Sequence, residues 1–213
     1  MITTIIFDLD NCLCAADEAG TRLLAPVAEA VRNTNNGRLP DAILERALAD
    51  CWRLPFDWVA STYGFPEDMR SAAWSAYTRL EVEGPLRGYR DLHLLRELPV
   101  RRFLVTSGFR RLQQSKIRAL GLEPCFTSVH IDAIDEPGIK GKRPIFEEIL
   151  QLHALRPDEV LVVGDSPESE IAAGNSLGLA TVQILRPGVR RSEDASHHVH
   201  GLAELERLLG SAG

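Results

Sequence analysis

Five short apolar stretches, most of them separated by helical patterns, constrain the fold of this chain more than any other feature of its sequence. They cover residues 4–7, 102–105, 128–131, 160–163 and 181–185, and each contains the β-branched residues typical of buried strands. Between the last four stretches lie helical patterns at residues 110–120, 144–153 and about 167–177. Strands that alternate with helices predict an α/β fold, with a parallel sheet that carries helices on both faces.

The interval between the first two strands breaks this rhythm, because residues 15–87 show only helical patterns. The segments "LLAPVAEAV", "DAILERALADCW" and "MRSAAWSAYTRL" each place apolar residues at i, i+3 and i+4. A crossover between two parallel strands needs one helix rather than three. We therefore expect residues 15–87 to form an all-helical cap, inserted into a core made of residues 1–14 and 88–213.

Composition excludes several classes of protein. The formal net charge of −6 argues against a nucleic-acid partner, because such binding depends on clustered positive charge. We find no apolar run long enough to span a membrane and no secretory signal pattern, so we expect no membrane partner. Four cysteines in 213 residues do not make a disulfide scaffold, which favours the reducing cytoplasm. The oligomeric state is not indicated.

Polar residues follow the predicted strands at one edge of the sheet. Open parallel sheets bind their ligands just outside the carboxyl ends of the strands, so these positions are the first candidates for a site. They are Asp8, Asp10, Thr106, Ser107, Gly108, Lys140, Lys142 and Asp165.

The residue types at this edge favour one kind of chemistry. Neighbouring carboxylates need a cation to relieve their repulsion, and an all-oxygen donor set suits Mg²⁺. If a helix begins just after Thr106, the backbone amides of Ser107 and Gly108 offer an anion site. A lysine would offset both a carboxylate and a phosphoryl group. Together they predict phosphoryl transfer, with a carboxylate nucleophile, a metal ion and donors around the transferred group.

Four motifs in this order resemble those of the haloacid dehalogenase superfamily, in its phosphatase form. "DLDNCL" is similar to the first motif, Asp-x-Asp-x-Thr/Val-Leu, and "FLVTSG" to the second, an apolar strand that ends in Thr or Ser. "KGKRPIF" resembles the lysine motif, and "VLVVGDSPESEIAAGNSLGLATV" resembles the fourth, with its acidic pair. The resemblance implies a Rossmann-like core and a helical cap of the C1 type.

The resemblance also implies roles for the acidic residues. Asp8 would be the nucleophile that forms an aspartyl-phosphate. Asp10 would protonate the leaving oxygen and then activate water, and its backbone carbonyl would bind Mg²⁺. Asp165 and the Asp8 carboxylate would complete the protein ligands of the metal. General acid–base assistance of this kind contributes about 10²–10⁴-fold in rate.

The remaining positions would hold the phosphoryl group. Thr106 would bind its oxygens together with the Ser107 and Gly108 amides. Lys142 is the favoured active-site lysine, both as a catalytic and as a phosphate-binding residue, with Lys140 as its rival.

Two positions depart from the family pattern, and two cysteines stand beside the first motif. Cys12 occupies a position where Thr or Val is common, and Glu170 one where an Asp often follows the fourth-motif Asp165. Glu168 and Glu170 suit either the first turn of a helix or a metal site. Cys12 and Cys14 have no partner pair at metal-binding spacing, so we interpret them as buried packing residues.

These observations predict a Mg²⁺-dependent phosphatase that hydrolyses a small phosphorylated metabolite. A nucleoside monophosphate or a sugar phosphate would suit a site covered by a cap, which excludes water but admits little of a macromolecule. The alternatives are a phosphomutase of the same superfamily and a phosphate-binding module that has lost catalysis. In the cap, aromatic residues around Arg53 either form its core or select the leaving group.

Overall fold

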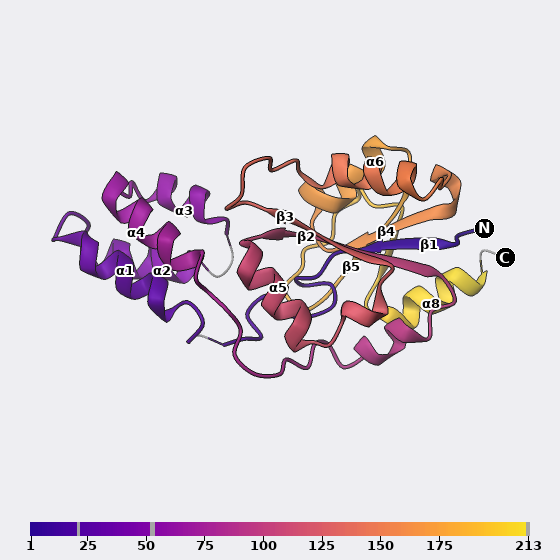
Figure 1. The fold of residues 1–213 in the computed structure, drawn as a ribbon, viewed down its shortest axis with the longest axis horizontal. Coiled ribbons are helices and arrows are strands. Elements are labelled where there is room, and N and C mark those ends of the chain that lie inside the picture. Colours follow the sequence, from indigo (N-terminus) through magenta and orange to yellow (C-terminus); the bar gives the residue numbers. More distant parts are fainter. Residues whose placement is uncertain (21, 52–53, 212–213) are drawn as a thin grey trace.

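A parallel sheet forms the centre of the fold in the computed structural model, which describes residues 1–20, 22–51 and 54–211 (Figure 1). Its strands are β1 (Thr4–Phe7), β2 (Arg101–Gly108), β3 (Ser128–Ala133), β4 (Val160–Gly164), β5 (Ala180–Ile184) and β6 (His197–Val199). They lie in the order β3-β2-β1-β4-β5-β6, and all their pairings are parallel. The predicted α/β fold is confirmed, with β6 as a further strand at the edge.

Helices cover both faces of this sheet. They are α5 (Arg110–Ala119), α6 (Lys142–Leu152), α7 (Ala172–Ser176) and α8 (Leu202–Ser211). Successive residues of a strand point to opposite faces, and β1 follows this rule. Its residues Ile5 and Phe7 pack in one hydrophobic cluster with residues of α5 and α8, whereas Ile6 packs in another with α6 and α7. Figure 1 shows α6 on one side of the sheet and α5 and α8 on the other.

Several elements differ from the sequence prediction, and three of these differences concern residues near the strand ends and the lysine motif. Strand β2 continues to Gly108 instead of ending at residue 105, because its last residues pair with β3. Helix α6 begins at Lys142 rather than at Pro144. The helix predicted at residues 167–177 is divided into a π-helical turn, Pro167–Ile171, and the short α7. Short 3₁₀ helices connect other elements at Leu92–Arg96, Glu123–Cys125 and Pro157–Glu159.

The segment between β1 and β2 is helical, as its periodicity predicts. It contains α1 (Ala25–Asn35), α2 (Asp41–Asp50), α3 (Phe56–Thr62) and α4 (Glu67–Tyr77), which Figure 1 shows beside the sheet rather than on one of its faces. These helices share a hydrophobic cluster of their own, separate from the two that flank the sheet.

Phe109 connects this helical insertion to the core. It follows the last residue of β2 directly and is buried in the hydrophobic cluster of the insertion. Its ring stacks on Tyr77, with centroids 4.8 Å apart and planes 5° apart, and meets Trp74 edge-on at 4.9 Å. Aromatic pairs in such geometries add about 0.5–1.5 kcal/mol each beyond the area they bury. The insertion is therefore in direct contact with the residue that follows the second motif.

The two chain segments that connect the insertion to the core are joined by hydrogen bonds. The Glu18 carboxylate accepts the backbone N–H groups of Arg87 at 2.6 Å and Gly88 at 2.9 Å. Gly88 has φ 68°, and a Cβ there would lie 2.9 Å from the carbonyl oxygen of Leu13 and would clash with Leu92. Only glycine suits this close approach.

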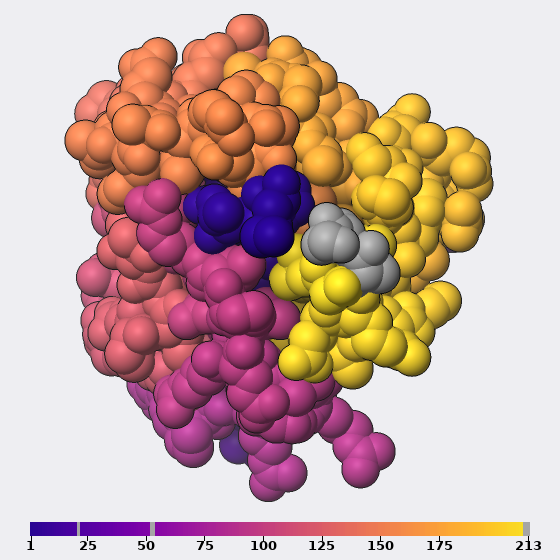
Figure 2. Space-filling model, turned by 90° about the vertical axis from the view of Figure 1, so that its right-hand side faces the viewer, coloured from indigo at the N-terminus to yellow at the C-terminus, as the bar shows by residue number. Residues whose placement is uncertain are grey.

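The two termini of the described chain lie at the end of the molecule opposite the insertion. Figure 2 shows the N-terminal residues on this face beside the C-terminal helix α8. The strands therefore present their carboxyl ends toward the insertion, in agreement with Figure 1. Among the described residues, no helix combines the length and the apolar character required to cross a membrane.

Candidate active site

A pocket of about 180 Å³ lies where β1, β2 and β4 end and α6 begins. Its lining residues are Asp8, Asp10, Asn11, Thr106, Ser107, Lys142, Asp165, Ser166, Ser169 and Glu170. Of the residues predicted from the sequence for this site, Gly108 and Lys140 do not line the pocket. The others are brought together from segments as far apart as β1 and β4.

Lys142 joins two buried carboxylates in this pocket. Its Nζ lies 2.5 Å from Asp8 Oδ1 and 2.5 Å from Glu170 Oε2. The three side chains are 6%, 8% and 2% exposed, in the order Lys142, Asp8, Glu170. Asp8 continues the line of β1 and donates its N–H to the carbonyl of Val163 on β4, at 2.9 Å. Two strands and a helix start thus fix the positions of these charges.

The loop before Lys142 is held by a buried acid on the edge strand. Asp132 of β3 is 6% exposed, and its carboxylate accepts the backbone N–H groups of Lys140 at 3.0 Å and Gly141 at 3.2 Å. Gly141 has φ 75°, a conformation that favours glycine. The turn at Gly141 allows α6 to begin with Lys142 directed into the pocket.

Burial opposes the ionisation of the acids in the pocket, and Lys142 offsets this effect to a different extent for each. Burial raises the pKa of Asp8 well above its ordinary value, and the attraction of Lys142 only partly offsets this rise. Burial and the nearby Glu170 raise the pKa of Asp165 to about 6. For Glu170 burial also favours the protonated form, but Lys142 and the Ser166 N–H at 2.8 Å outweigh it and lower the pKa.

The donor set fits a divalent metal ion. Carboxylate oxygens of Asp8, Asp165 and Glu170 all lie within 4.8 Å of one another. Three carboxylates against the single ammonium of Lys142 leave two formal negative charges, which a divalent cation would balance. The Asp10 carboxylate is not part of this group. Of the atoms of Asp10, only the backbone carbonyl therefore stays a predicted metal ligand.

The Asp10 carboxylate is bound by helix α5. Its Oδ1 lies 2.7 Å from Lys116 Nζ, and its Oδ2 accepts a hydrogen bond from Gln113 Nε2 at 2.9 Å. Neither α5 residue was predicted from the sequence. The available signal was their spacing of three residues, which puts two long polar side chains on one face of a helix that must cover a sheet.

Thr106 lines the pocket, but the prediction that the Ser107 and Gly108 amides form a helix N-terminus beside it is wrong. Thr106 is 1% exposed, and its Oγ1 accepts a hydrogen bond from Gln113 Nε2 at 2.7 Å. Ser107 and Gly108 remain in strand β2, so their amides do not form the N-terminus of a helix. Helix α5 begins at Arg110, whose N–H donates to Asp135 Oδ1 at 2.8 Å. Thr106 and Ser107 line the pocket without that helix end.

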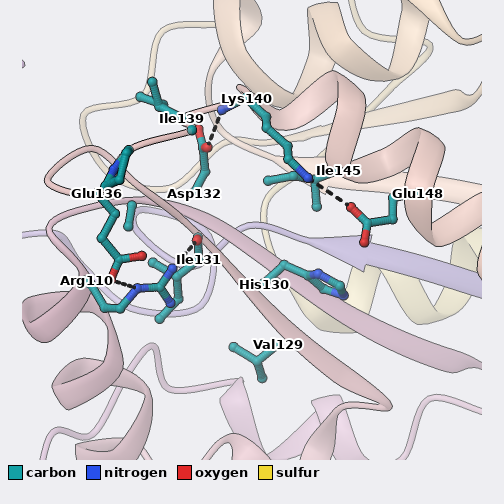
Figure 3. Close-up of a pocket in the computed structure, with 13 residues that line it drawn as sticks. Arg110, Val129, His130, Ile131, Asp132, Glu136, Ile139, Lys140, Ile145 and Glu148 are labelled. Atoms are coloured by element: carbon teal, nitrogen blue, oxygen red, sulfur yellow. Dashed lines mark hydrogen bonds and ion pairs between the residues drawn. The ribbon is translucent and has the colours of Figure 1, made fainter.

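The structure separates the two candidate lysines. Figure 3 shows the side chain of Lys140 in a different pocket, of about 340 Å³, beside edge strand β3. Its Nζ lies 3.4 Å from Glu148, and both side chains are more than half exposed. Lys142 contacts Asp8, whereas Lys140 contributes only its backbone N–H to Asp132.

Other residues singled out in the sequence have simpler surroundings. Cys12 and Cys14 are fully buried free thiols in the core cluster, where burial raises the pKa of each. Glu168 is exposed and stands apart from the acidic group that Glu170 joins. Arg53 lies outside the described residues. The structure adds Arg186, a buried side chain that donates to the Cys12 carbonyl at 3.1 Å and so supports the turn after Asp10.

Gly164 offers a test of the Glu170 position. A Cβ at residue 164 would collide with the Glu170 side chain, including its Oε1. We expect Gly164→Ala to push Glu170 away from Lys142 and from the Ser166 N–H. Displacement of positioned groups by about 1 Å can cost on the order of 10²-fold in rate, so the turnover of any substrate should fall by about that factor.

Gly210→Ala is the matched control for this experiment, because a Cβ there meets open space. It should leave turnover unchanged. Wild-type turnover in Gly164→Ala would mean that the Glu170–Lys142 contact is not needed for activity.

The sequence is similar to a family model and to proteins of known activity. A family model for haloacid dehalogenase-like hydrolases matches residues 2–178. The chain is 29% identical over 204 residues to the glyceraldehyde 3-phosphate phosphatase of Methanopyrus kandleri, covering 87% of this chain and 85% of that protein. It is 36% identical over 111 residues to the pyrimidine 5'-nucleotidase YjjG of Escherichia coli, covering 50% of this chain and 48% of that one.

Solved structures share the fold. A HAD phosphatase from Thermococcus onnurineus aligns with a TM-score of 0.67 and 22% identity, over 98% of each chain. The L-2-haloacid dehalogenase of Xanthobacter autotrophicus aligns with a TM-score of 0.62 and 18% identity, over 100% of each chain. At these identities the likeness concerns the fold alone, and the fold is common to enzymes named for different reactions.

Proposed function

The chain belongs to the haloacid dehalogenase-like hydrolase family, and from this premise we propose that it is a Mg²⁺-dependent phosphatase acting on a small phosphorylated metabolite. The reaction would proceed through an aspartyl-phosphate on Asp8. The phosphatase names of the relatives support this proposal, and the site supplies the groups for the chemistry.

The observation that carries the proposal is a second carboxylate, Asp10, in the same pocket as Asp8. A halide leaves without needing a proton, whereas the alkoxide expelled from a phosphate ester must be protonated as it departs. A dehalogenase therefore has no use for an acid at position 10, and a phosphatase does. Asp10 also forms its ion pair with Lys116, whereas Asp8 forms one with Lys142, so the two carboxylates have different partners.

The proposed reaction has two steps. In the first, an Asp8 carboxylate oxygen bonds to phosphorus, the bond from phosphorus to the ester oxygen breaks, and Asp10 gives that oxygen a proton. In the second, Asp10 takes a proton from a water molecule, whose oxygen bonds to phosphorus and releases Asp8 and inorganic phosphate. The reuse of one group as acid and then base leaves Asp10 in its starting form.

The other residues would bind the phosphoryl group and balance its charge. Lys142 would offset the charge of Asp8 and of the phosphoryl oxygens, and Thr106 and Ser107 would bind those oxygens. Mg²⁺ would supply a positive charge that stabilises the transferring group, held by the Asp8 and Asp165 carboxylates and the Asp10 backbone carbonyl. Glu170 would keep Lys142 in place.

The helical insertion would act as a cap over the pocket. We propose residues 15–87 as this cap and residues 1–14 and 88–213 as the catalytic core. The contact of Phe109 with Tyr77 and Trp74 supports a link between the cap and the second motif. A cap of this kind would exclude water during transfer and restrict the substrate to small molecules.

A sugar phosphate or a nucleoside monophosphate is the proposed class of substrate. Relatives that align over most of both chains are named for glyceraldehyde 3-phosphate, and the nucleotidase match covers about half of each. Glyceraldehyde 3-phosphate is therefore the first compound to test, and pyrimidine nucleoside 5'-monophosphates are the second. A cytoplasmic location remains a prediction.

Release of inorganic phosphate from a panel of phosphorylated metabolites tests the proposal. We expect turnover of at least one small phosphate ester with Mg²⁺ present and none after chelation with EDTA. Conversion of a sugar phosphate to its isomer without net phosphate release would identify a phosphomutase instead. Tight phosphate binding without turnover of any ester would identify a binding module.

A further inference from the structure

Two side chains of helix α5 bind the two oxygens of the Asp10 carboxylate separately. Lys116 Nζ lies 2.7 Å from Oδ1, and Gln113 Nε2 lies 2.9 Å from Oδ2. With each oxygen held by a different residue, both the position and the plane of the carboxylate are fixed. The proposed mechanism needs Asp10 to face the leaving oxygen but assigns no group to keep it there.

Lys116 is buried, which makes its partner important. Its side chain is 7% exposed, and Asp10 is the one carboxylate with which it forms an ion pair among the described residues. A buried ammonium is costly without a counter-charge, so the fold stabilises Lys116 only if Asp10 remains beside it. The pair therefore favours the ionised form of Asp10, and each oxygen keeps a second lone pair at which the proton of the reaction can bind.

Gln113 links Asp10 to the phosphate-binding strand. It is 2% exposed, and its Nε2 also lies 2.7 Å from Thr106 Oγ1 and 3.1 Å from the Ser107 carbonyl, so its two hydrogens are shared among three acceptors. Its Oε1 has no hydrogen-bond partner among the described residues. A flipped amide would turn that oxygen toward the Asp10 carboxylate and the Ser107 carbonyl, which are acceptors, so the donor orientation is fixed. Thr106 and Asp10 are thus connected through one amide.

Two acids that line the pocket, Asp8 and Asp10, are thus paired with different lysines. Lys142 is bound to Asp8 and Glu170, and Lys116 is bound to Asp10. Because Asp10 is paired with Lys116, its carboxylate forms no ion pair with Lys142 and stays outside the acidic group at which a cation would bind. We propose that Lys116 and Gln113 are positioning residues that hold Asp10 for proton transfer to the leaving group. The inference rests on the proposed phosphatase function.

The dependence of the rate on the leaving group distinguishes this role from a merely structural one. An alkyl phosphate needs a proton from Asp10 during phosphoryl transfer, whereas p-nitrophenolate is stable enough to leave without one. The value of kcat/KM reports the steps up to that transfer. The ratio of kcat/KM for the two substrates is also independent of the fraction of active protein in a preparation.

The experiment measures this ratio in wild type, Lys116→Met, Asp10→Asn and the double variant, with the best alkyl phosphate of the panel and p-nitrophenyl phosphate. We expect Lys116→Met to lower kcat/KM for the alkyl ester at least about tenfold more than for the aryl ester, as part of the roughly 10²–10⁴-fold contribution of a general acid. Asp10→Asn should change the ratio in the same direction and further. Lys116→Met should then add nothing to it in the Asp10→Asn background.

Arg118→Met is the control on the same helix, because Arg118 is exposed and pairs only with Glu81 among the described residues. It should leave the ratio unchanged. Equal losses for both esters in Lys116→Met would overturn the positioning role while leaving the phosphatase function intact. Absence of turnover of every ester by the wild type would overturn both, so the two failures are distinguishable.

Discussion

Asp8→Asn is expected to reduce phosphate release to the level of the buffer control. The amide nitrogen and oxygen of Asn have the shape of the carboxylate but lack its nucleophilicity, so the aspartyl-phosphate cannot form. The variant should still fold, because Lys142 keeps Glu170 at 2.5 Å as its counter-charge. Phosphate release measured with the best substrate of the panel, together with a circular dichroism spectrum, checks both expectations.

Asp158→Asn is the control for this substitution, since Asp158 is an exposed acid that does not line the pocket. It should retain wild-type turnover. Substantial turnover in Asp8→Asn would mean that another group, or water directly, attacks phosphorus.

Lys142→Met is expected to abolish activity and to destabilise the protein. The substitution keeps most of the side-chain volume but leaves Asp8 and Glu170 buried without their shared counter-charge. Breaking a buried pair in this way costs about 3–5 kcal/mol in the free energy of unfolding, because the remaining charge is uncompensated. Urea unfolding followed by circular dichroism measures the stability, and phosphate release measures the activity.

A second variant separates the two effects. Lys142→Met combined with Glu170→Gln removes one of the two unpaired buried charges, so it should recover part of the stability but none of the activity.

Lys140→Met tests the rival lysine. Its pair with Glu148 is exposed, so we expect a change within about 0.5 kcal/mol and near-normal turnover. Loss of activity in Lys140→Met but not in Lys142→Met would reverse the assignment.

The grouping of residues at the strand ends could be predicted from the sequence, because the geometry of a parallel sheet allows few alternatives. Once five apolar stretches are identified as parallel strands, the residues after them must gather at one edge. This is why Asp8, Thr106, Lys142 and Asp165 were expected together and lie together. The acidic residue Glu170 could be named as a candidate, but its contact with Lys142 depends on the π-helical turn, which no sequence pattern indicated.

The side chains of α5 could not be predicted in the same way. The direction in which Gln113 and Lys116 point depends on how α5 rotates against the sheet, and that rotation is set by packing rather than by local sequence. The predicted helix N-terminus at Ser107 and Gly108 was also wrong, because pairing with β3 keeps both residues extended and α5 begins at Arg110. Arg186 follows the last of the five predicted strands, and its burial against the Cys12 carbonyl depends on tertiary contacts that no local pattern indicates.

The most direct test of the account is to trap the phosphorylated enzyme. In Asp10→Asn, p-nitrophenyl phosphate should still phosphorylate Asp8, because its leaving group needs no acid, but hydrolysis of the intermediate should be slow without the base. Acid quenching followed by mass spectrometry of peptides should find one phosphoryl group, on the peptide that contains Asp8. A phosphoryl group on another peptide, or turnover of the ester with no phosphorylated enzyme at any time, would contradict the assignment of Asp8 as the nucleophile.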